Sequence, residues 1–410
     1  MARHPIPASP AERERLLEAR RELKKACSVQ AYVRGTTSRF YEWLGTTGAR
    51  AVPRGPALWI CGDCHFGNLG PIARADGRVE IELRDFDQAV VGNPAHDLIR
   101  LALSLAMVAR GSDLPGTATV HLTEEIVRGY KSAFAARDEE RPEVAGSVAR
   151  PIRLTLKEAL RRSWRHLLDE RTGGRSSSLA LCKSFWPLTE AERAAVGALF
   201  ATESVRRVVT ALWCRDDGAK VELVDAAYWV KGCSSLGGWR AAALIELGGK
   251  KAAAGGRVGL VDLKEALPAC APADPGADLP SHQGERVVMA ARRLSSFAGE
   301  RMLAGTLRDK PIVLRELLPQ DLKIEIQRIS EREAREVAYF LARIVGAAHA
   351  RQLDGATRAA WLSELESRPS KSTDTPTWLW ESIAALVSLH EGAYLEHCRR
   401  HGCPATSSIS

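Results

Sequence analysis

The sequence lacks the features of a membrane or exported protein. No apolar run approaches the roughly 18 residues that a membrane-spanning helix needs, and residues 1–25 contain no apolar core of a signal peptide. Its nine cysteines are an odd and scattered set, which favours reduced thiols over a disulfide framework. We therefore expect a cytoplasmic protein without a membrane partner.

A dense basic run is also missing. The net charge of +8 over 410 residues is a mild excess, which suits anionic ligands such as phosphates but gives little reason to expect nucleic-acid binding. The longest basic cluster, Arg20, Arg21, Lys24 and Lys25, alternates with acids, as on a solvated helix face. The ten tryptophans are scattered and indicate packing rather than base stacking. We expect no nucleic-acid partner, and no pattern indicates an oligomeric state.

The length and the hydrophobic fraction of 45% suit two domains or lobes. Residues 1–219 combine an amino-terminal helix, a motif-rich segment and helices, residues 220–325 alternate apolar strands with glycine turns, and residues 326–410 return to helical spacing. Ser9, Pro10 and Glu12 mark the start of the first helix. Further helices are predicted at 122–137, 151–170, 284–298, 331–352 and 376–397, a strand at 312–317 and a connector at 367–377. The fold class that follows is α+β.

The densest chemistry lies in LWICGDCHFGNLG (58–70) and VEIELRDFDQAVVGNPAHDLIRL (79–101). Asp76-Gly77 between them is a hairpin turn signal. A hairpin there would fold the chain back on itself and bring the polar residues of both segments together: Asp63, His65, Asn68, Asp85 and Asp87. Carboxylate and amide oxygens beside strand ends suit Mg²⁺, which prefers one or two carboxylates plus substrate phosphates.

The interval from Asp63 to Asn68 is the spacing between the catalytic Asp and the metal-binding Asn of a kinase catalytic loop. The two segments together resemble the signature of aminoglycoside and choline phosphotransferases. More closely, the chain resembles the bacterial DUF2252 family, which combines GDxHxxNFG, NDFDE and GPxxxDLxRLxxS. Further marks of that family are AYVRGTT (31–37), VKGCSSLG (230–237), LKEA (263–266), GERVV (284–288) and GAAHARQ (346–352), so the resemblance covers about residues 30–355.

The resemblance implies a two-lobe, protein-kinase-like fold and an ATP- and Mg²⁺-dependent phosphotransferase acting on a hydroxyl of an acceptor that the sequence does not identify. By this resemblance Asp63 is the catalytic residue, in a loop that His65 shapes. Asn68, Asp85 and Asp87 would hold the metal.

The phosphate-binding elements that the resemblance requires come after the catalytic loop. Nothing before residue 58 fits them, which implies a circularly permuted kinase-like fold with a helical insertion. Their residues would be Gly232, Ser234, Ser235 and Gly237 in a glycine loop, Lys264 on a following strand, and Glu285 as the partner of that lysine. Two positions depart from the pattern: Ser234 replaces a glycine, and Met289 stands where related sequences carry an acid.

Two further residues have structural interpretations. Asp97 is expected to start a helix and brace the catalytic loop, and His349 to lie in the core.

Other functions fit parts of the same segment. Cys61-x-x-Cys64-His65 is the spacing of a haem c attachment site, but haem c is attached outside the cytoplasm. G-D-x-H also resembles calcineurin-like metallophosphoesterases, although no D-x-H precedes Asp63 and VGNPAHD is a distorted counterpart of their G-N-H motif. A catalytically inactive, kinase-like nucleotide-binding module is the remaining alternative.

Overall fold

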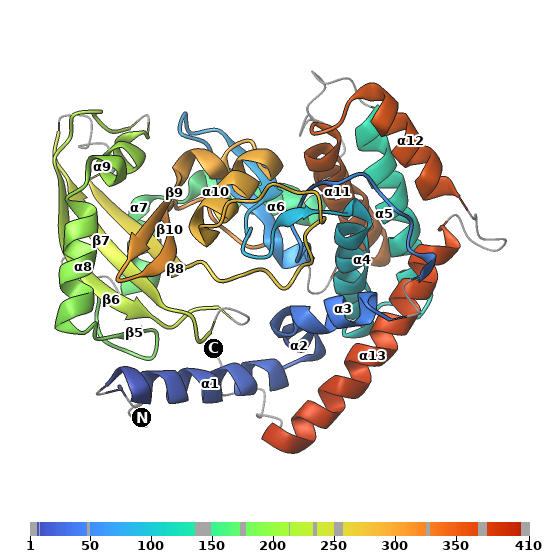
Figure 1. Cartoon of the computed structure of the whole chain (residues 1–410), viewed down its shortest axis with the longest axis horizontal. Coiled ribbons are helices and arrows are strands. Elements are labelled where there is room, and N and C mark those ends of the chain that lie inside the picture. Colours follow the sequence, from blue (N-terminus) through green and yellow to red (C-terminus); the bar gives the residue numbers. More distant parts are fainter. Residues whose placement is uncertain are drawn as a thin grey trace.

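The computed structural model describes residues 6–7, 9–46, 50–135, 149–172, 178–212, 214–232, 236–249, 257–324, 329–367 and 375–402. Ser234 and Ser235 lie outside these residues, as does most of the predicted connector at 367–377. A six-stranded antiparallel sheet stands beside a group of long helices (Figure 1). This mixture confirms the predicted α+β class.

The sheet has the strand order β5-β6-β7-β8-β10-β9. Its elements are β5 (Phe185–Trp186), β6 (Val221–Trp229), β7 (Arg240–Leu247), β8 (Val258–Glu265), β9 (Met302–Leu307) and β10 (Lys310–Leu317), and every neighbouring pair is antiparallel. The strands predicted within 220–265 and at 312–317 are confirmed. β5 and β9 are additions that the sequence did not predict.

The two faces of the sheet pack against different helices. One face meets α8 (Glu190–Phe200) and α9 (Glu203–Thr210) in a cluster that includes Val261 and Leu263. The other face packs against α7 (Trp164–Thr172) through Leu260 and neighbouring residues. Since side chains alternate along a strand, Lys264 belongs to the face opposite Val261 and Leu263.

Long helices form the other half of the molecule: α4 (Pro94–Arg110), α5 (Ala118–Ala135), α11 (Glu331–Ala350), α12 (Gly355–Glu366) and α13 (Thr377–His401). The backbones of α5 and α11 approach closely, because a Cβ at Gly129 would clash with the Tyr339 backbone and one at Gly346 would meet the Tyr130 carbonyl oxygen at 2.6 Å. The close pairing of these helices fixes the helical core.

The prediction of one continuous helix at 151–170 is wrong. This stretch contains two helices, α6 (Arg150–Arg161) and α7. Arg162 takes extended backbone angles at the break, φ −74° and ψ 137°, and the hydroxyl of Ser163 then accepts from the His166 amide at 3.5 Å. The break turns the chain from the helical half toward the sheet.

The motif-rich segment lies between the sheet and the long helices (Figure 1). β2 (Leu69–Ala73) pairs with β3 (Val79–Leu83) in the predicted hairpin, and Gly77 in its turn has φ +89°. β1 (Leu58–Ile60) pairs with β4 (Val90–Gly92). The helix α10 (Gln283–Leu294) and the 3-10 helices Phe66–Asn68 and Ala298–Arg301 complete this layer.

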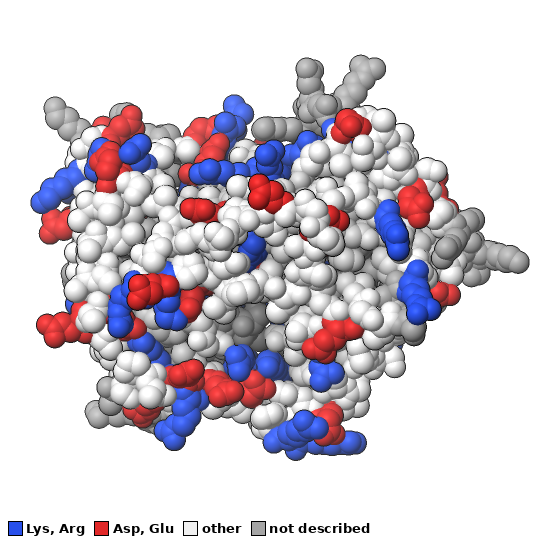
Figure 2. Space-filling view, in the orientation of Figure 1, with Lys and Arg blue, Asp and Glu red and all other residues white. Residues whose placement is uncertain are grey.

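The amino-terminal helix connects the two halves. α1 (Pro10–Ala26) begins as predicted, with the hydroxyl of Ser9 accepting from the Glu12 amide. It runs along the bottom of Figure 1 from the sheet toward α13, followed by α2 (Val29–Gly35) and α3 (Thr37–Leu44). In the described part of the chain, no helix is both long and apolar enough to cross a membrane. On the face drawn in Figure 2, basic and acidic side chains are interspersed.

Candidate functional site

A tight loop at residues 61–68, the Asp63 loop, joins β1 to β2. Gly62 has φ +73°, and a Cβ there would clash with the carbonyl oxygen of Gln88. The carbonyl oxygen of Asp63 accepts from the Asn68 side-chain amide and from the His65 backbone amide, each at 2.9 Å. The two ends of the D-x-x-x-x-N spacing are therefore tied together directly.

The carboxylate of Asp63 is held from two sides. Oδ1 accepts from the guanidinium of Arg100, whose Nε lies 3.1 Å away, and Oδ2 accepts from the Thr37 hydroxyl at 3.0 Å. Asp63 is only 7% exposed and the Arg100 side chain is fully buried. These bonds from a guanidinium and a hydroxyl fix the orientation of the Asp63 side chain.

Neither Arg100 nor Thr37 was predicted from the sequence as a partner of Asp63. Arg100 stands one helical turn after Asp97 in α4, and Thr37 begins α3 within the AYVRGTT segment. The helical spacing of Asp97 and Arg100, which places them on one face, was the available signal.

Asp97 anchors the start of the Asp63 loop, as predicted. Its carboxylate accepts from the backbone amides of Cys61 at 2.7 Å and Gly62 at 2.9 Å. The same carboxylate lies 3.2 Å from Nε2 of His349, whose Nδ1 lies 2.9 Å from the Tyr130 hydroxyl. The core position predicted for His349 is confirmed, and its hydrogen bonds connect α5 and α11 to the loop.

His65 is buried and its pKa is lowered to about 3 because burial disfavours the charged ring. It is therefore neutral near pH 7. Its backbone carbonyl accepts from the Asn68 amide at 2.8 Å, and its ring would lie 3.1 Å from a Cβ at Gly67. A neutral ring packed within the loop fits the loop-shaping role expected from the sequence.

The two cysteines of the loop are buried. Cys61 and Cys64 are free thiols with no exposed surface. The pKa of Cys64 lies well above its ordinary value because of its hydrogen bond with Cys61 and because of burial. Fully buried, protonated thiols are poor groups for haem attachment or dithiol exchange.

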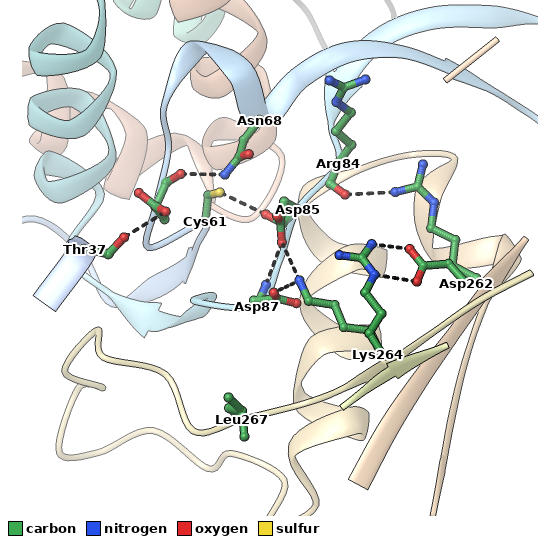
Figure 3. Close-up of polar contacts among 12 residues, drawn as sticks. Thr37, Cys61, Asn68, Arg84, Asp85, Asp87, Asp262, Lys264 and Leu267 are labelled. Atoms are coloured by element: carbon green, nitrogen blue, oxygen red, sulfur yellow. Dashed lines mark hydrogen bonds and ion pairs between the residues drawn. The ribbon is translucent and has the colours of Figure 1, made fainter. Parts of the chain in front are cut away.

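Lys264 reaches across from the sheet to the end of the hairpin (Figure 3). Its ammonium forms an ion pair with Asp87 and lies 4.0 Å from Oδ1 of Asp85. Partial burial would raise the pKa of Asp85, but the charges of Lys264 and then Arg240 hold it below its usual range. The structure thus brings together residues about 180 positions apart in the sequence.

The predicted partner of Lys264 is wrong. Glu285 lies exposed in the first turn of α10, where its backbone amide donates to the His282 ring. It forms no ion pair with Lys264, although both residues are described. The lysine meets the two hairpin carboxylates instead, because α10 turns a different residue, Arg286, toward the hairpin.

Arg286 was missed as a site residue. Its buried guanidinium donates to the carbonyl oxygens of Asp87 at 2.9 Å and Leu267 at 2.9 Å, and also to that of Ala89. Burial lowers the pKa of Arg286 to about 10, so it stays charged at neutral pH. It fixes the segment that carries Asp87.

Two more arginines surround Lys264 on the sheet. Arg240 on β7 pairs with Asp262, which precedes Lys264 by two residues on β8 and so shares its face. Arg315 on β10 donates to the Arg84 carbonyl oxygen at 3.0 Å, next to Asp85. The cross-strand register pairs Arg240 with Lys264 and Arg315 with Asp262, an arrangement that strand alternation alone did not predict.

The glycine segment is described only at its ends. Gly232 has φ +102° and Gly237 has φ +113°, backbone angles that side chains disfavour. The carbonyl oxygen of Gly232 accepts from Lys24 at 2.8 Å, and that of Leu236 from Arg21 at 3.3 Å. Helix α1 therefore contacts this segment directly.

The oxygen donors of the site fit a hard divalent cation. The side-chain nitrogen of Asn68 is used by the Asp63 carbonyl oxygen, so its Oδ1 is the atom left to act as a ligand. The Asp85 and Asp87 side chains are 46% and 30% exposed, and water or a ligand can reach them. One amide oxygen and two carboxylates are a set that suits Mg²⁺.

Comparison with known proteins identifies a family and no individual relative. No curated protein and no solved structure matches the chain. The model of one family, described as "Uncharacterized protein conserved in bacteria (DUF2252)", matches residues 14–400. That range includes the Asp63 loop, the hairpin and Lys264, so the chain belongs to the DUF2252 family.

Proposed function

We propose that this protein is an ATP- and Mg²⁺-dependent, kinase-like phosphotransferase that transfers a phosphoryl group to a hydroxyl of an unidentified acceptor. The observation that carries the proposal is the meeting of Lys264 with Asp85 and Asp87 beside a loop that contains Asp63 and Asn68. A lysine on a small antiparallel sheet, opposite an Asp and Asn loop, is the arrangement that phosphoryl transfer uses in kinases.

The proposal includes a permuted order of the kinase-like elements. The sheet with Lys264 follows the Asp63 loop in the chain, whereas kinases place it first. Such a rearrangement is tolerable because contacts between elements, rather than chain order, define a packed core.

In this proposal Asp63 orients the acceptor hydroxyl and accepts its proton. Arg100 and Thr37 hold the carboxylate in a fixed orientation. A fixed carboxylate suits a transfer whose rate comes mainly from positioning and electrostatics. Proton transfer itself would contribute about 10²–10⁴-fold.

Asn68, Asp85 and Asp87 would hold Mg²⁺, which supplies charge neutralisation for the nucleotide phosphates when bound. Lys264 would add a contact with phosphate oxygens to its ion pair with Asp87, because an ammonium carries three donors. The glycine segment at 232–237, with its two positive-φ glycines, would cover the phosphates through backbone amides.

A metallophosphoesterase is the second candidate function considered from the sequence. Its dinuclear centre needs several His and Asp ligands in one cluster. Within the part of the chain that the structure describes, no group of three or more His, Cys, Asp or Glu ligand atoms gathers around Asp63. The described residues around Asp63 therefore do not assemble the ligand set of that dinuclear centre.

The test is nucleotide binding that depends on the metal. ATP with Mg²⁺ should raise the melting temperature of the wild-type protein, and Asp85→Ala should remove this effect and any phosphoryl transfer. Asp76→Ala is the matched control, since Asp76 is an exposed carboxylate in the turn of the same hairpin. Absence of any Mg²⁺-dependent nucleotide effect in the wild type would refute the proposal. Hydrolysis of a chromogenic phosphate ester with Mn²⁺ and no nucleotide would favour the phosphoesterase. Nucleotide binding without phosphoryl transfer would favour the inactive nucleotide-binding module.

A further inference from the structure

Three metal-ligand side chains converge where α1 meets α13, outside the site described above. They are Glu22 on α1 and His397 and His401 on α13. Nδ1 of His397 lies 3.8 Å and Nε2 of His401 lies 4.0 Å from the same oxygen, Oε2 of Glu22. The histidines are four residues apart and therefore share one helix face, and all three ligand atoms lie within 4.8 Å of one another.

The hydrogen bonds around His397 orient it as a metal ligand. Its Nε2 lies 3.0 Å from the backbone carbonyl oxygen of Glu22. A carbonyl oxygen only accepts, so Nε2 carries the hydrogen, and Nδ1 is the ring atom that faces Oε2 of Glu22. A ring N–H donated to a backbone carbonyl is also the usual support of a metal-bound histidine.

The two oxygens of Glu22 have different surroundings. Oε1 accepts from Lys25 at 2.9 Å and from Arg21 at 3.3 Å. The closest approaches of both histidines are to Oε2. The neighbouring cations thus occupy one oxygen and leave the second directed at the imidazoles.

We propose that Glu22, His397 and His401 form a Zn²⁺-binding site, and that the bound ion joins α1 to α13. Two imidazoles and one carboxylate suit Zn²⁺ better than Mg²⁺, which prefers oxygen ligands. Tetrahedral Zn²⁺ with bonds of about 2.0–2.1 Å needs ligand atoms about 3.3 Å apart. The present distances of 3.8 and 4.0 Å would have to shorten on binding, and the side chains of Glu22 and His401 are the more exposed ligands, at 21% and 39%.

The surroundings leave one side of the site open. The His397 side chain is 10% exposed and packs against Tyr32, with ring centroids 5.2 Å apart. The larger exposure of His401 leaves room for water as the fourth ligand. Bound Zn²⁺ would hold α1 against α13. The same helix α1 contacts the carbonyl oxygens of the glycine segment through Lys24 and Arg21.

The experiment is calorimetric titration of Zn²⁺ into the full-length protein, stripped of metal and carrying no polyhistidine tag. We expect one Zn²⁺ per chain, with binding weakened at least about tenfold in His401→Ala and in Glu22→Gln. His121→Ala is the matched control, because Nδ1 of His121 also contacts a carboxylate, Glu331, at 2.5 Å but without a second histidine in the group. The His121→Ala variant should bind Zn²⁺ with the affinity of the wild type.

The same titration decides the outcome. Zn²⁺ affinity that is unchanged in His401→Ala and Glu22→Gln overturns the proposal, as does a wild-type protein that binds no Zn²⁺. Both variants alter partly exposed side chains, so they are expected to fold, which circular dichroism checks. Amide hydrogen exchange supplies a second readout: Zn²⁺ should slow exchange in α1 and α13 of the wild type and not of His401→Ala.

Discussion

Replacing Lys264 by methionine tests whether the sheet and the hairpin form one nucleotide site. Methionine keeps much of the length of the side chain and removes only its charge and its donors. The lysine is 17% exposed and pairs with Asp87, which is 30% exposed. Because water can solvate the carboxylates left behind, we expect the free energy of unfolding to fall by no more than about 1–2 kcal/mol.

The expected effect on nucleotide binding is larger. A hydrogen bond between charged groups contributes about 1.5–3 kcal/mol, which corresponds to an affinity loss of about 10- to 150-fold. Phosphoryl transfer should fall at least as far, because the charge developing on the phosphate also loses its partner. Arg240 and Arg315 remain, so residual binding is expected.

The assay is calorimetric titration of ATP with Mg²⁺ into the wild type, Lys264→Met and Lys310→Met. Lys310 is the matched control, since it pairs with Glu265 at 2.6 Å on the same sheet and is 48% exposed. Its variant should bind nucleotide as the wild type does. If Lys264→Met binds ATP with unchanged affinity, Lys264 does not contact phosphate and the sheet does not contribute to the site as proposed.

Three further predictions concern stability. Asp97→Ala should lower the free energy of unfolding by about 2–3 kcal/mol or more, measured by urea denaturation, because two loop amides lose their acceptor. Arg215→Met should cost about 3–5 kcal/mol, since it leaves the fully buried Glu316 without its ion-pair partner; the double change with Glu316→Leu should recover most of that loss in the same assay. Burial alone would raise the pKa of Glu192, but hydrogen bonds, chiefly from Arg13, lower it to about 2. The contribution of Glu192 to stability is therefore complete above its ordinary pKa of 4.5 and is lost as pH falls toward 2. The stability difference between wild type and Glu192→Gln should accordingly shrink below pH 4.5 in acid titrations.

Local signals in the sequence predicted much of the architecture. The Asp76-Gly77 turn, the strands of 220–265 and the cap of α1 all depend on residues close together in the chain. Turn chemistry, side-chain alternation and capping act over a few residues, so they can be read without the rest of the molecule. The sequence also grouped Asp63 with Asn68, because a short loop limits how far its ends can separate.

Contacts between distant elements were decided by packing. The sequence predicted Glu285 as the partner of Lys264. In the structure the orientation of α10 places Arg286, rather than Glu285, against the hairpin. Lys264 instead lies beside Asp85 and pairs with Asp87. Arg100 and Thr37 likewise meet Asp63 only because α4 and α3 pack around the loop.

The same distinction holds at the α1–α13 contact. The spacing of His397 and His401 is visible in the sequence, but Glu22 lies 375 residues away from His397. Periodicity determines which side chains share a face of one helix. Which face meets which neighbour depends on the shape and burial of the whole core, because close packing admits few arrangements of the elements, and only the tertiary structure contains that information.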